Sequence, residues 1–342
     1  MIDPRRLFVR YPGNPILTAA DLPYPVNSVF NPGAIQLGQE TLLIMRAEHF
    51  TGQSHFVIAR SHDGVSDWRV DLDHNLLPDP IHYPEDRFGI EDARIVEAPG
   101  EGYLVTFTSF SLQGPAVSLA RTQDFHTFER LGVICPADDK DAALFPRKFG
   151  GYWLLIHRPT KDFNVAPRRS PLESLGDRFL RRPSQIPVAF GNICISRSLD
   201  LINWDHTSRL LGVRDASWWD ANKIGMGPPP LETSEGWLLL YHGVRTTGSG
   251  SLYRSGLALL DLADPTKVIA RGDDFMLGPE TLYERTGDVP NVVFPSGWIL
   301  DPNGHTLRVY YGAADSSICM VTAELPSLLT YLQSDSSRAA KT

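Results

Sequence analysis

A unit of three short apolar strands recurs five times along this chain, and this repeat constrains the fold more than any other feature. The middle strand of each unit is rich in Leu, Val and aromatic residues, and it usually begins at a Gly turn. A strand that ends in a polar turn precedes it, and in most units a strand of small and apolar residues follows. Successive middle strands begin about 50 to 85 residues apart, which suits the four-stranded blades of a propeller. The five middle strands are expected at residues 41–47, 102–107, 151–158, 236–242 and 306–311.

The repeat predicts an all-β fold, a five-bladed β-propeller that spans residues 1–342 as a single catalytic domain, although length alone suggests about two domains. A β-sandwich with similar strands is the alternative. In the first three units the third strand runs into a turn that resembles the Asp-box of propeller blades. There an Asp tightens the turn and an aromatic side chain packs between sheets. These turns run from Asp63 to Trp68, from Asp124 to Phe128 and from Asp200 to Trp204.

Two segments lie outside the repeat. We expect residues 1–24 to help close the ring of blades. The longest insertion, residues 160–187, is rich in Arg and Pro and interrupts the third unit. It is expected to form a loop with a short helix over residues 172–180, which could serve as a lid or as an oligomer contact.

The composition excludes several classes of protein. Hydrophobic residues make up 42% of the chain and charged residues 21%, as in globular proteins. The net charge of −8 argues against a nucleic-acid partner, because a phosphate backbone needs a basic face, although a local basic pocket is compatible with it. No run approaches the roughly 18 apolar residues of a membrane helix, and no apolar segment of a signal peptide follows the first residues. We therefore expect a cytoplasmic protein without a membrane partner.

Cysteines and histidines give no sign of a metal or another cofactor. The three cysteines, Cys135, Cys194 and Cys319, are far apart in sequence and form no CxxC pair, so each is expected to be a small buried residue in a reducing compartment. The histidines of the first repeat lack the HxH and HExxH spacings of metal sites.

Polar residues fall at matching places in the repeat. The first strand of a propeller blade lines the central channel, and side chains at its start face the channel mouth. Ordinary turn residues are the alternative for any one of them, but together they indicate a shared pocket. The five expected inner strands open with Asn31, Glu91-Asp92, Lys140-Asp141, Lys223 and Asn291.

The ends of the middle strands also carry polar side chains. A charged residue is costly to bury at the end of an apolar strand unless a partner or ligand receives it. Two cations and a histidine at one rim therefore favour an anion site, in which Arg offers phosphate a bidentate fork. The residues concerned are Arg46, His157-Arg158, Tyr241-His242 and Tyr311 to Asp315.

These residues lie in segments that resemble glycoside hydrolase family 130. Residues 89–95 resemble the Glu-Asp-Pro-Arg signature of that family, with Ala93 in place of the usual Pro. Because Ala93 lies beside the key Asp and does not replace it, we expect only a small change in backbone rigidity. The other matching segments are residues 29–32, 140–146, 156–159, 225–230, 236–243 and 310–315. They occur in the family's order over nearly the whole chain, and the resemblance implies a five-bladed propeller.

The resemblance also implies the site residues. Asp92 matches the general acid, which protonates the glycosidic oxygen through a hydroxyl of the mannose itself. Phosphate attacks the opposite face of the anomeric carbon and releases α-mannose 1-phosphate with inversion. The resemblance places Arg158, His242 and Lys140 at the phosphate, and Asn27, Ser28, Asn31, Arg46 and Asp315 at the mannose. Glu91 and Arg94 are expected to orient Asp92, and Tyr241 is expected to contact the substrate. Inorganic phosphate is a co-substrate, and no cofactor is expected.

The chemistry favours phosphorolysis over its alternatives. An inverting hydrolase needs a second carboxylate to activate water, whereas phosphate is already an anionic nucleophile and needs cations that hold it in line. A β-mannosidase of the same family is the first alternative, and a mannan-binding lectin is the second. A five-bladed furanosidase would need three separated carboxylates, and sialidases have six blades. The linkage, the acceptor sugar and the oligomeric state, including a homo-oligomer, stay open.

Overall fold

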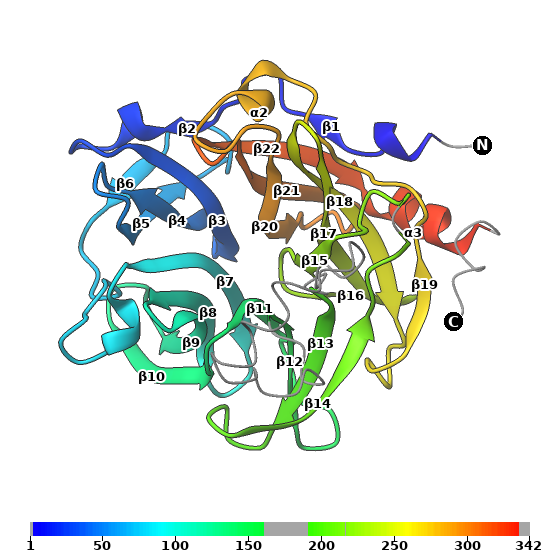
Figure 1. Cartoon of the computed structure of the whole chain (residues 1–342), viewed down its shortest axis with the longest axis horizontal. Coiled ribbons are helices and arrows are strands. Elements are labelled where there is room, and N and C mark those ends of the chain that lie inside the picture. The colour runs from blue at the N-terminus through cyan, green and yellow to red at the C-terminus, as the bar shows by residue number, and fades with distance from the viewer. Residues whose placement is uncertain (1–2, 161–190, 216, 335–342) are drawn as a thin grey trace, which may run out of the picture.

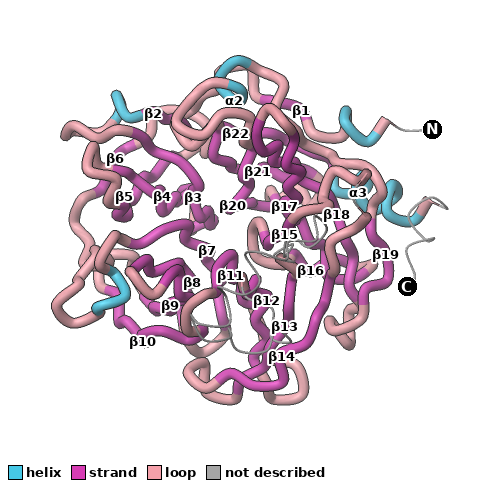
Figure 2. The backbone as a smooth tube through the Cα atoms, viewed as in Figure 1, coloured by secondary structure: helices cyan, strands magenta, loops and turns pink. Residues whose placement is uncertain are grey.

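The computed structural model describes residues 3–160, 191–215 and 217–334. Five antiparallel sheets stand around a central axis (Figure 1). In the first four sheets the strand nearest the axis comes first in the sequence, and in the fifth the innermost strand is β20, while the outer edge comes from the N-terminal segment. The tube view shows that strands form the body and that the few helical turns lie at its margin (Figure 2). The predicted five-bladed β-propeller is confirmed, and the sandwich alternative is wrong.

Blades one to three each consist of four strands that follow one another outward from the axis. Blade one contains β3 (Ser28–Leu37), β4 (Glu40–Glu48), β5 (Ser54–Ser61) and β6 (Arg69–Asp71). Blade two contains β7 (Ile90–Ala98), β8 (Gly102–Ser111), β9 (Gly114–Thr122) and β10 (Phe128–Cys135). Blade three contains β11 (Asp139–Leu144), β12 (Trp153–Pro159), β13 (Ile193–Ser198) and β14 (Trp204–Leu211).

Blades four and five each have an additional short strand. Blade four contains β15 (Lys223–Met226), β16 (Leu231–Thr233), β17 (Gly236–Thr247), β18 (Gly250–Leu260) and β19 (Val268–Arg271). Blade five contains β20 (Val293–Leu300), β21 (Thr306–Ala313) and β22 (Ser317–Glu324). Its outer edge is completed from the N-terminal segment by β1 (Val9–Arg10) and β2 (Leu17–Thr18), which both pair with β22.

This pairing closes the ring, as expected of residues 1–24. Arg10 of β1 fastens it, because its guanidinium contacts the fully buried Glu284 with an Nε to Oε1 distance of 2.8 Å. The same carboxylate accepts a hydrogen bond of 2.8 Å from the hydroxyl of Tyr311 in β21. The N-terminal segment is thereby tied to blade five by both backbone and side chains.

Helices are few and short among the described residues, and none of them is long and apolar enough to cross a membrane. They are the 3-10 helices η1 (Pro4–Arg6), η2 (Ala19–Asp21) and η3 (Pro84–Asp86), and the α-helices α2 (Leu282–Arg285) and α3 (Leu325–Gln333). The predicted helix over residues 172–180, and nearly all of the insertion at 160–187, lie outside the described residues.

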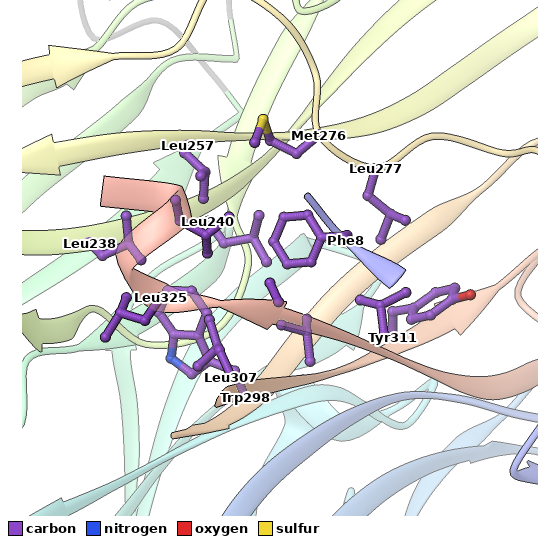
Figure 3. Packing of buried hydrophobic residues seen from close by; sticks show 14 of the residues in the cluster. Phe8, Leu238, Leu240, Leu257, Met276, Leu277, Trp298, Leu307, Tyr311 and Leu325 are labelled. Atoms are coloured by element: carbon purple, nitrogen blue, oxygen red, sulfur yellow. The ribbon is translucent and has the colours of Figure 1, made fainter. Parts of the chain in front are cut away.

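The hydrophobic core is divided into five clusters, and each fills the space between two neighbouring blades. Alternate residues of a strand point to opposite faces of its sheet, so each blade supplies side chains to the clusters on both of its sides. In the cluster between blades four and five, Phe8 packs near Leu240 and Leu277 (Figure 3). Burial of apolar surface therefore holds the blades together around the axis.

The three predicted Asp-box turns are present. In the first, Asp63 Oδ1 accepts hydrogen bonds from the backbone amides of Val65 and Ser66, both at 2.8 Å. Asp124 and Asp200 accept equivalent pairs of backbone hydrogen bonds. Each carboxylate satisfies amides that the tight turn leaves unpaired, which is why Asp is required there.

The inner strand of each of the first three blades contains a β-bulge near its start. The pairing register skips two residues between Phe30 and Gly33, and equivalent shifts occur in β7 and β11. The first skipped residue has a left-handed backbone in all three: Asn31 (φ 46°), Asp92 (φ 56°) and Asp141 (φ 55°). Asn and Asp adopt this conformation more readily than other residues that carry a Cβ atom. Bulges re-aim side chains, and these three side chains meet at the axis.

Candidate active site

A cavity of about 170 Å³ lies where the inner strands of the blades meet. Polar and charged side chains from all five blades make up most of its wall, and three apolar residues beside the start of β20 complete it. The lining residues are Asn31, Arg46, Asp92, Lys140, Asp141, Arg158, Lys223, His242, Tyr253, Val289, Val292, Phe294 and Asp315. The shared pocket predicted from the strand ends is therefore present.

Asp92 is held at the bulge of β7 by two neighbours. Asn31 Nδ2 donates a hydrogen bond of 2.9 Å to Asp92 Oδ1, and Arg46 Nη1 lies 3.4 Å from the same oxygen. Asp92 is 3% exposed, and burial alone would raise its pKa. The positive charges of Arg46 and Arg94 outweigh burial and hold the pKa of Asp92 below its ordinary value. Asp92 is thus a carboxylate in the free protein.

Asp315 is the second carboxylate of the cavity, and its environment acts in the opposite direction. Burial and the negative charge of Asp92 raise the pKa of Asp315 to about 7, although Arg46 favours ionisation. Asp315 lies in the β21–β22 hairpin with a left-handed backbone, φ 49°. Two carboxyl groups of one cavity whose pKa values are pushed apart can play different parts, one as an ion and one as a hydrogen-bond donor.

The other side of the cavity is built around Asp141. Arg158 Nε donates a hydrogen bond of 2.7 Å to Asp141 Oδ2, and His242 Nε2 lies 3.5 Å from that oxygen. Despite burial, Arg158 and His242 hold the pKa of Asp141 well below its ordinary value. Burial lowers the pKa of His242 to about 3, so its imidazole is neutral at physiological pH.

Lys223 and Lys140 add cationic charge beside this pair. Burial, followed by repulsion from Arg158, lowers the pKa of Lys223 to about 8. Its ammonium lies 5.0 Å from the ring centroid of Tyr253, which also stacks on His242 at 6.0 Å. Three cationic side chains and one neutral imidazole surround a single carboxylate, so this side of the cavity favours an added anion.

Unpaired buried atoms and close glycines mark where a ligand would fit. Asn31 Oδ1, Asp141 Oδ1 and His242 Nδ1 are buried without a hydrogen-bond partner in the described structure. A Cβ atom at Gly225 would collide with Asp141 and His242, and one at Gly312 would collide with Asn31. The two glycines therefore make the close approach of these side chains possible.

Five of the predicted site residues do not line the cavity. Glu91 contacts Arg46 at 3.2 Å and Lys140 at 4.0 Å, so it positions two cavity residues. Arg94 is buried, and its Nη1 donates a hydrogen bond of 2.6 Å to the backbone carbonyl of Asp92. Arg94 also donates hydrogen bonds to two backbone carbonyls of blade four, so it fixes the bulge of β7.

The remaining three are also absent from the cavity wall. Ser28 is buried, whereas Asn27 is exposed and donates a hydrogen bond of 2.6 Å to Asp288. Tyr241 is fully buried, and its hydroxyl contacts Asp220 and Arg271 at 3.0 Å each. Tyr241 and His242 are consecutive in β17, so they point to opposite faces of the sheet and only His242 reaches the cavity.

Of the polar residues that line the cavity, three have no individual role predicted from the sequence: Asp141, Lys223 and Tyr253. Asp141 and Lys223 were recognisable as polar openings of inner strands, the signal that drew attention to Lys140. Tyr253 had no such signal, because it lies in the polar first half of β18. Asn291 was expected to open the fifth inner strand, but β20 begins at Val293, and Asn291 does not line the cavity, whereas its neighbour Val292 does.

Comparison with known proteins identifies the family. The family model described as beta-1,4-mannooligosaccharide phosphorylase, that of glycoside hydrolase family 130, matches residues 7–334. The chain belongs to glycoside hydrolase family 130. The family resemblance noted in the sequence is thereby confirmed over nearly the whole chain.

Individual relatives in this family cover most of the chain. The chain is 35% identical to a β-1,2-mannobiose phosphorylase of Listeria innocua over 290 residues, 83% of this chain and 70% of that protein. It is 30% identical to a β-1,4-mannooligosaccharide phosphorylase of Ruminococcus albus over 342 residues, 96% of this chain and 91% of that protein. Among solved structures, the L. innocua β-1,2-mannobiose phosphorylase with bound β-1,2-mannobiose superposes with a TM-score of 0.79. That comparison has 29% identity and covers 95% of this chain and 99% of the other.

Proposed function

We propose that this family 130 protein is a β-mannoside phosphorylase. It transfers a mannosyl group from a β-mannoside to inorganic phosphate, with inversion, and releases α-mannose 1-phosphate and a shortened sugar. One observation carries the proposal: Asp92 and the cationic side chains of Arg158, Lys140 and Lys223 line one cavity. The phosphorylase names of relatives that are 30–35% identical support it.

The cationic side of the cavity is the proposed phosphate site. Arg158 and Lys140 supply positive charge, Lys223 joins them, and the neutral His242 donates one hydrogen bond to a phosphate oxygen. A phosphate oxygen bonds to the anomeric carbon as the glycosidic C–O bond breaks on the opposite face. No general base is needed for this attack, because the nucleophile is already an anion.

Asp92 is the proposed general acid. The proton passes to the departing glycosidic oxygen by way of a mannose hydroxyl, as the family resemblance implies. In the free protein the positive field around Asp92 keeps it ionised. A phosphate ion beside Lys140 offsets part of that field, so phosphate binding raises the pKa of Asp92 toward the protonated form that a general acid needs.

The mannose ring is proposed to lie against Asn31, Arg46 and Asp315, which line the cavity around Asp92. Asn27 and Ser28 are proposed to act at the margin of this subsite. Glu91 and Arg94 act as positioning residues, since one contacts Arg46 and the other holds the Asp92 backbone. Tyr241 is the exception: its hydroxyl is bound to Asp220 and Arg271, so we assign it a structural role.

The remaining proposals concern context. The five blades act as one catalytic domain that uses phosphate as co-substrate and needs no cofactor. The enzyme works in the cytoplasm, where phosphate is abundant, without a nucleic-acid or membrane partner. Because it moves a glycosyl group between two oxygen atoms, it is by chemistry a glycosyltransferase.

The decisive experiment compares phosphate with water as the acceptor. Purified protein is incubated with β-1,2- and β-1,4-linked mannosides, with and without phosphate, and the products are separated. We expect mannose 1-phosphate only when phosphate is present.

The reverse reaction is then assayed by supplying α-mannose 1-phosphate with candidate acceptor sugars and measuring phosphate release. Free mannose released equally in both conditions, with no reverse reaction, would identify a hydrolase instead. Binding without turnover would identify a lectin.

A further inference from the structure

A second cavity, of about 250 Å³, adjoins the proposed phosphate site on the opposite face of the same two strands. Consecutive residues of a strand face opposite sides, so β11 sends Lys140 to the active cavity and Asp139 to the second one. In β12, Arg158 likewise faces the active cavity and His157 faces the second cavity. The proposed phosphorolysis makes no use of the second cavity.

Three potential metal ligands meet in this second cavity. The ligand atoms of Cys135, Asp139 and His157 all lie within 4.8 Å of one another, and all three residues are buried. His157 Nδ1 is 2.6 Å from Asp139 Oδ2. The other ring nitrogen, Nε2, is 2.8 Å from the hydroxyl of Ser196, which in turn lies 2.7 Å from the hydroxyl of Thr207. This chain of contacts fixes the orientation of the imidazole, as partners of metal-binding histidines do.

The electrostatics of the second cavity favour a cation. Asp139 is 4% exposed, yet its Oδ1 atom is buried and has no hydrogen-bond partner in the described structure. The residues that line this cavity, all in the described part of the chain, include two aspartates and no lysine or arginine. A buried carboxylate oxygen without a partner is costly, and a bound cation would satisfy it.

We propose that Cys135, Asp139 and His157 bind one divalent transition-metal ion of the zinc type. A thiolate, an imidazole and a carboxylate together match the donors that zinc accepts, and three protein ligands leave a fourth position for solvent from the cavity. Binding releases the thiol proton and the proton shared between His157 and Asp139. The metal, the thiolate and the carboxylate then carry no net charge, so no unpaired buried charge is left.

The position of the site suggests its consequence. Cys135 ends β10, the outermost strand of blade two, while Asp139 begins β11, the innermost strand of blade three. His157 belongs to β12 of blade three. A bound ion would link the end of blade two to the first two strands of blade three. It would thereby restrict the movement of the strands that carry Lys140 and Arg158.

Cobalt provides a direct test, because tetrahedral Co²⁺ bound to a thiolate has a sulfur charge-transfer band and strong visible bands. The full-length protein is freed of metal with a chelator and titrated with Co²⁺ in phosphate-free buffer, and Zn²⁺ is then added in competition. We expect both sets of bands to appear at one equivalent and to vanish when Zn²⁺ is added. Cys135→Ala should abolish the charge-transfer band and weaken Zn²⁺ binding at least about 100-fold.

Cys319→Ala is the matched control, since Cys319 is also buried but lies in β22 of blade five. It should leave the spectrum and the Zn²⁺ affinity unchanged. Circular dichroism establishes whether each variant is folded. The wild-type spectrum tests the proposal even if Cys135→Ala fails to fold. A wild-type protein without the charge-transfer band, or a Zn²⁺ affinity that Cys135→Ala leaves unaltered, would overturn the proposal.

Discussion

Replacing Asp315 by Asn should stabilise the free protein at alkaline pH while it impairs catalysis. Asp315 is partly buried in the active cavity, where burial and Asp92 raise its pKa from an ordinary value of 3.8 to about 7. The folded protein therefore keeps this proton up to about pH 7, whereas the unfolded chain releases it near 3.8. Between these values the free energy of unfolding falls as the pH rises, and above them the loss is complete.

The pKa difference sets the size of the effect. Each pKa unit is worth about 1.4 kcal/mol, so the full shift corresponds to at most about 4 kcal/mol. Solvent reaches part of the Asp315 side chain and screens it, so we expect Asp315→Asn to gain about 2 kcal/mol at about pH 8. Near pH 4 the amide and the protonated acid are equivalent in shape and charge, and the two proteins should be equally stable.

Equilibrium urea unfolding, followed by tryptophan fluorescence over a series of pH values, measures this difference. Asp73→Asn is the control, because Asp73 is exposed and should change stability little at any pH. Activity is measured on the same samples, and kcat/KM for the mannoside should fall because Asp315 is proposed to contact the sugar. Equal stability of wild type and Asp315→Asn at about pH 8, or a gain that is the same near pH 4, would refute the reasoning.

Four further outcomes are expected. Asp92→Asn should keep the fold and lower kcat about 10²–10⁴-fold in initial-rate assays, and activity within about threefold of wild type would remove its role as general acid. Arg158→Ala should raise the KM for phosphate at least about tenfold and that for the mannoside much less; equal effects would contradict the phosphate assignment. In wild type the KM for phosphate should rise above about pH 8, as Lys223 loses its proton, and Lys223→Gln should flatten that rise. Gly225→Ala should weaken phosphate binding by displacing the side chains packed against it, whereas Gly248→Ala, which faces open space, should not.

The repeat predicted the fold because each blade carries its own local signals. The apolar strands, the Gly turns and the Asp-box turns are each encoded within a few residues, and the structure places strands at all five predicted middle segments. The sandwich alternative could be rejected only with the sheet order, which depends on contacts between residues far apart in sequence.

The candidate site was predictable where one residue carries a local signal. Asn31 and Asp92 lie near the start of inner strands, and Arg158 lies near the end of a largely apolar one; all three line the cavity. The direction of a side chain was harder to predict. Tyr241 and His242 are adjacent, and only the strand register decides which of them faces the axis.

Other properties of the site depend on residues that meet only in the folded protein. Tyr253 lines the cavity because β18 begins at Gly250, six residues before its apolar half at residues 256–260. The pKa of Lys223 is lowered by burial and by Arg158 of the neighbouring blade. The pairing of Cys135 with Asp139 and His157 likewise depends on the packing of blade two against blade three, so the histidine spacing could not reveal it.

Because the N-terminal segment closes the ring, ring closure can occur only late in biosynthesis. Val9 of β1 pairs with Thr322 of β22, so β1 has no partner during synthesis until the last blade is made. At about 5–20 residues per second, that interval lasts roughly 15–60 s. A fast-folding fusion partner placed before Met1 would already be folded and attached next to this two-residue strand during the whole interval in which the strand is unpaired. The same partner placed after the C-terminal helix would be synthesised only when the strands of all five blades already exist.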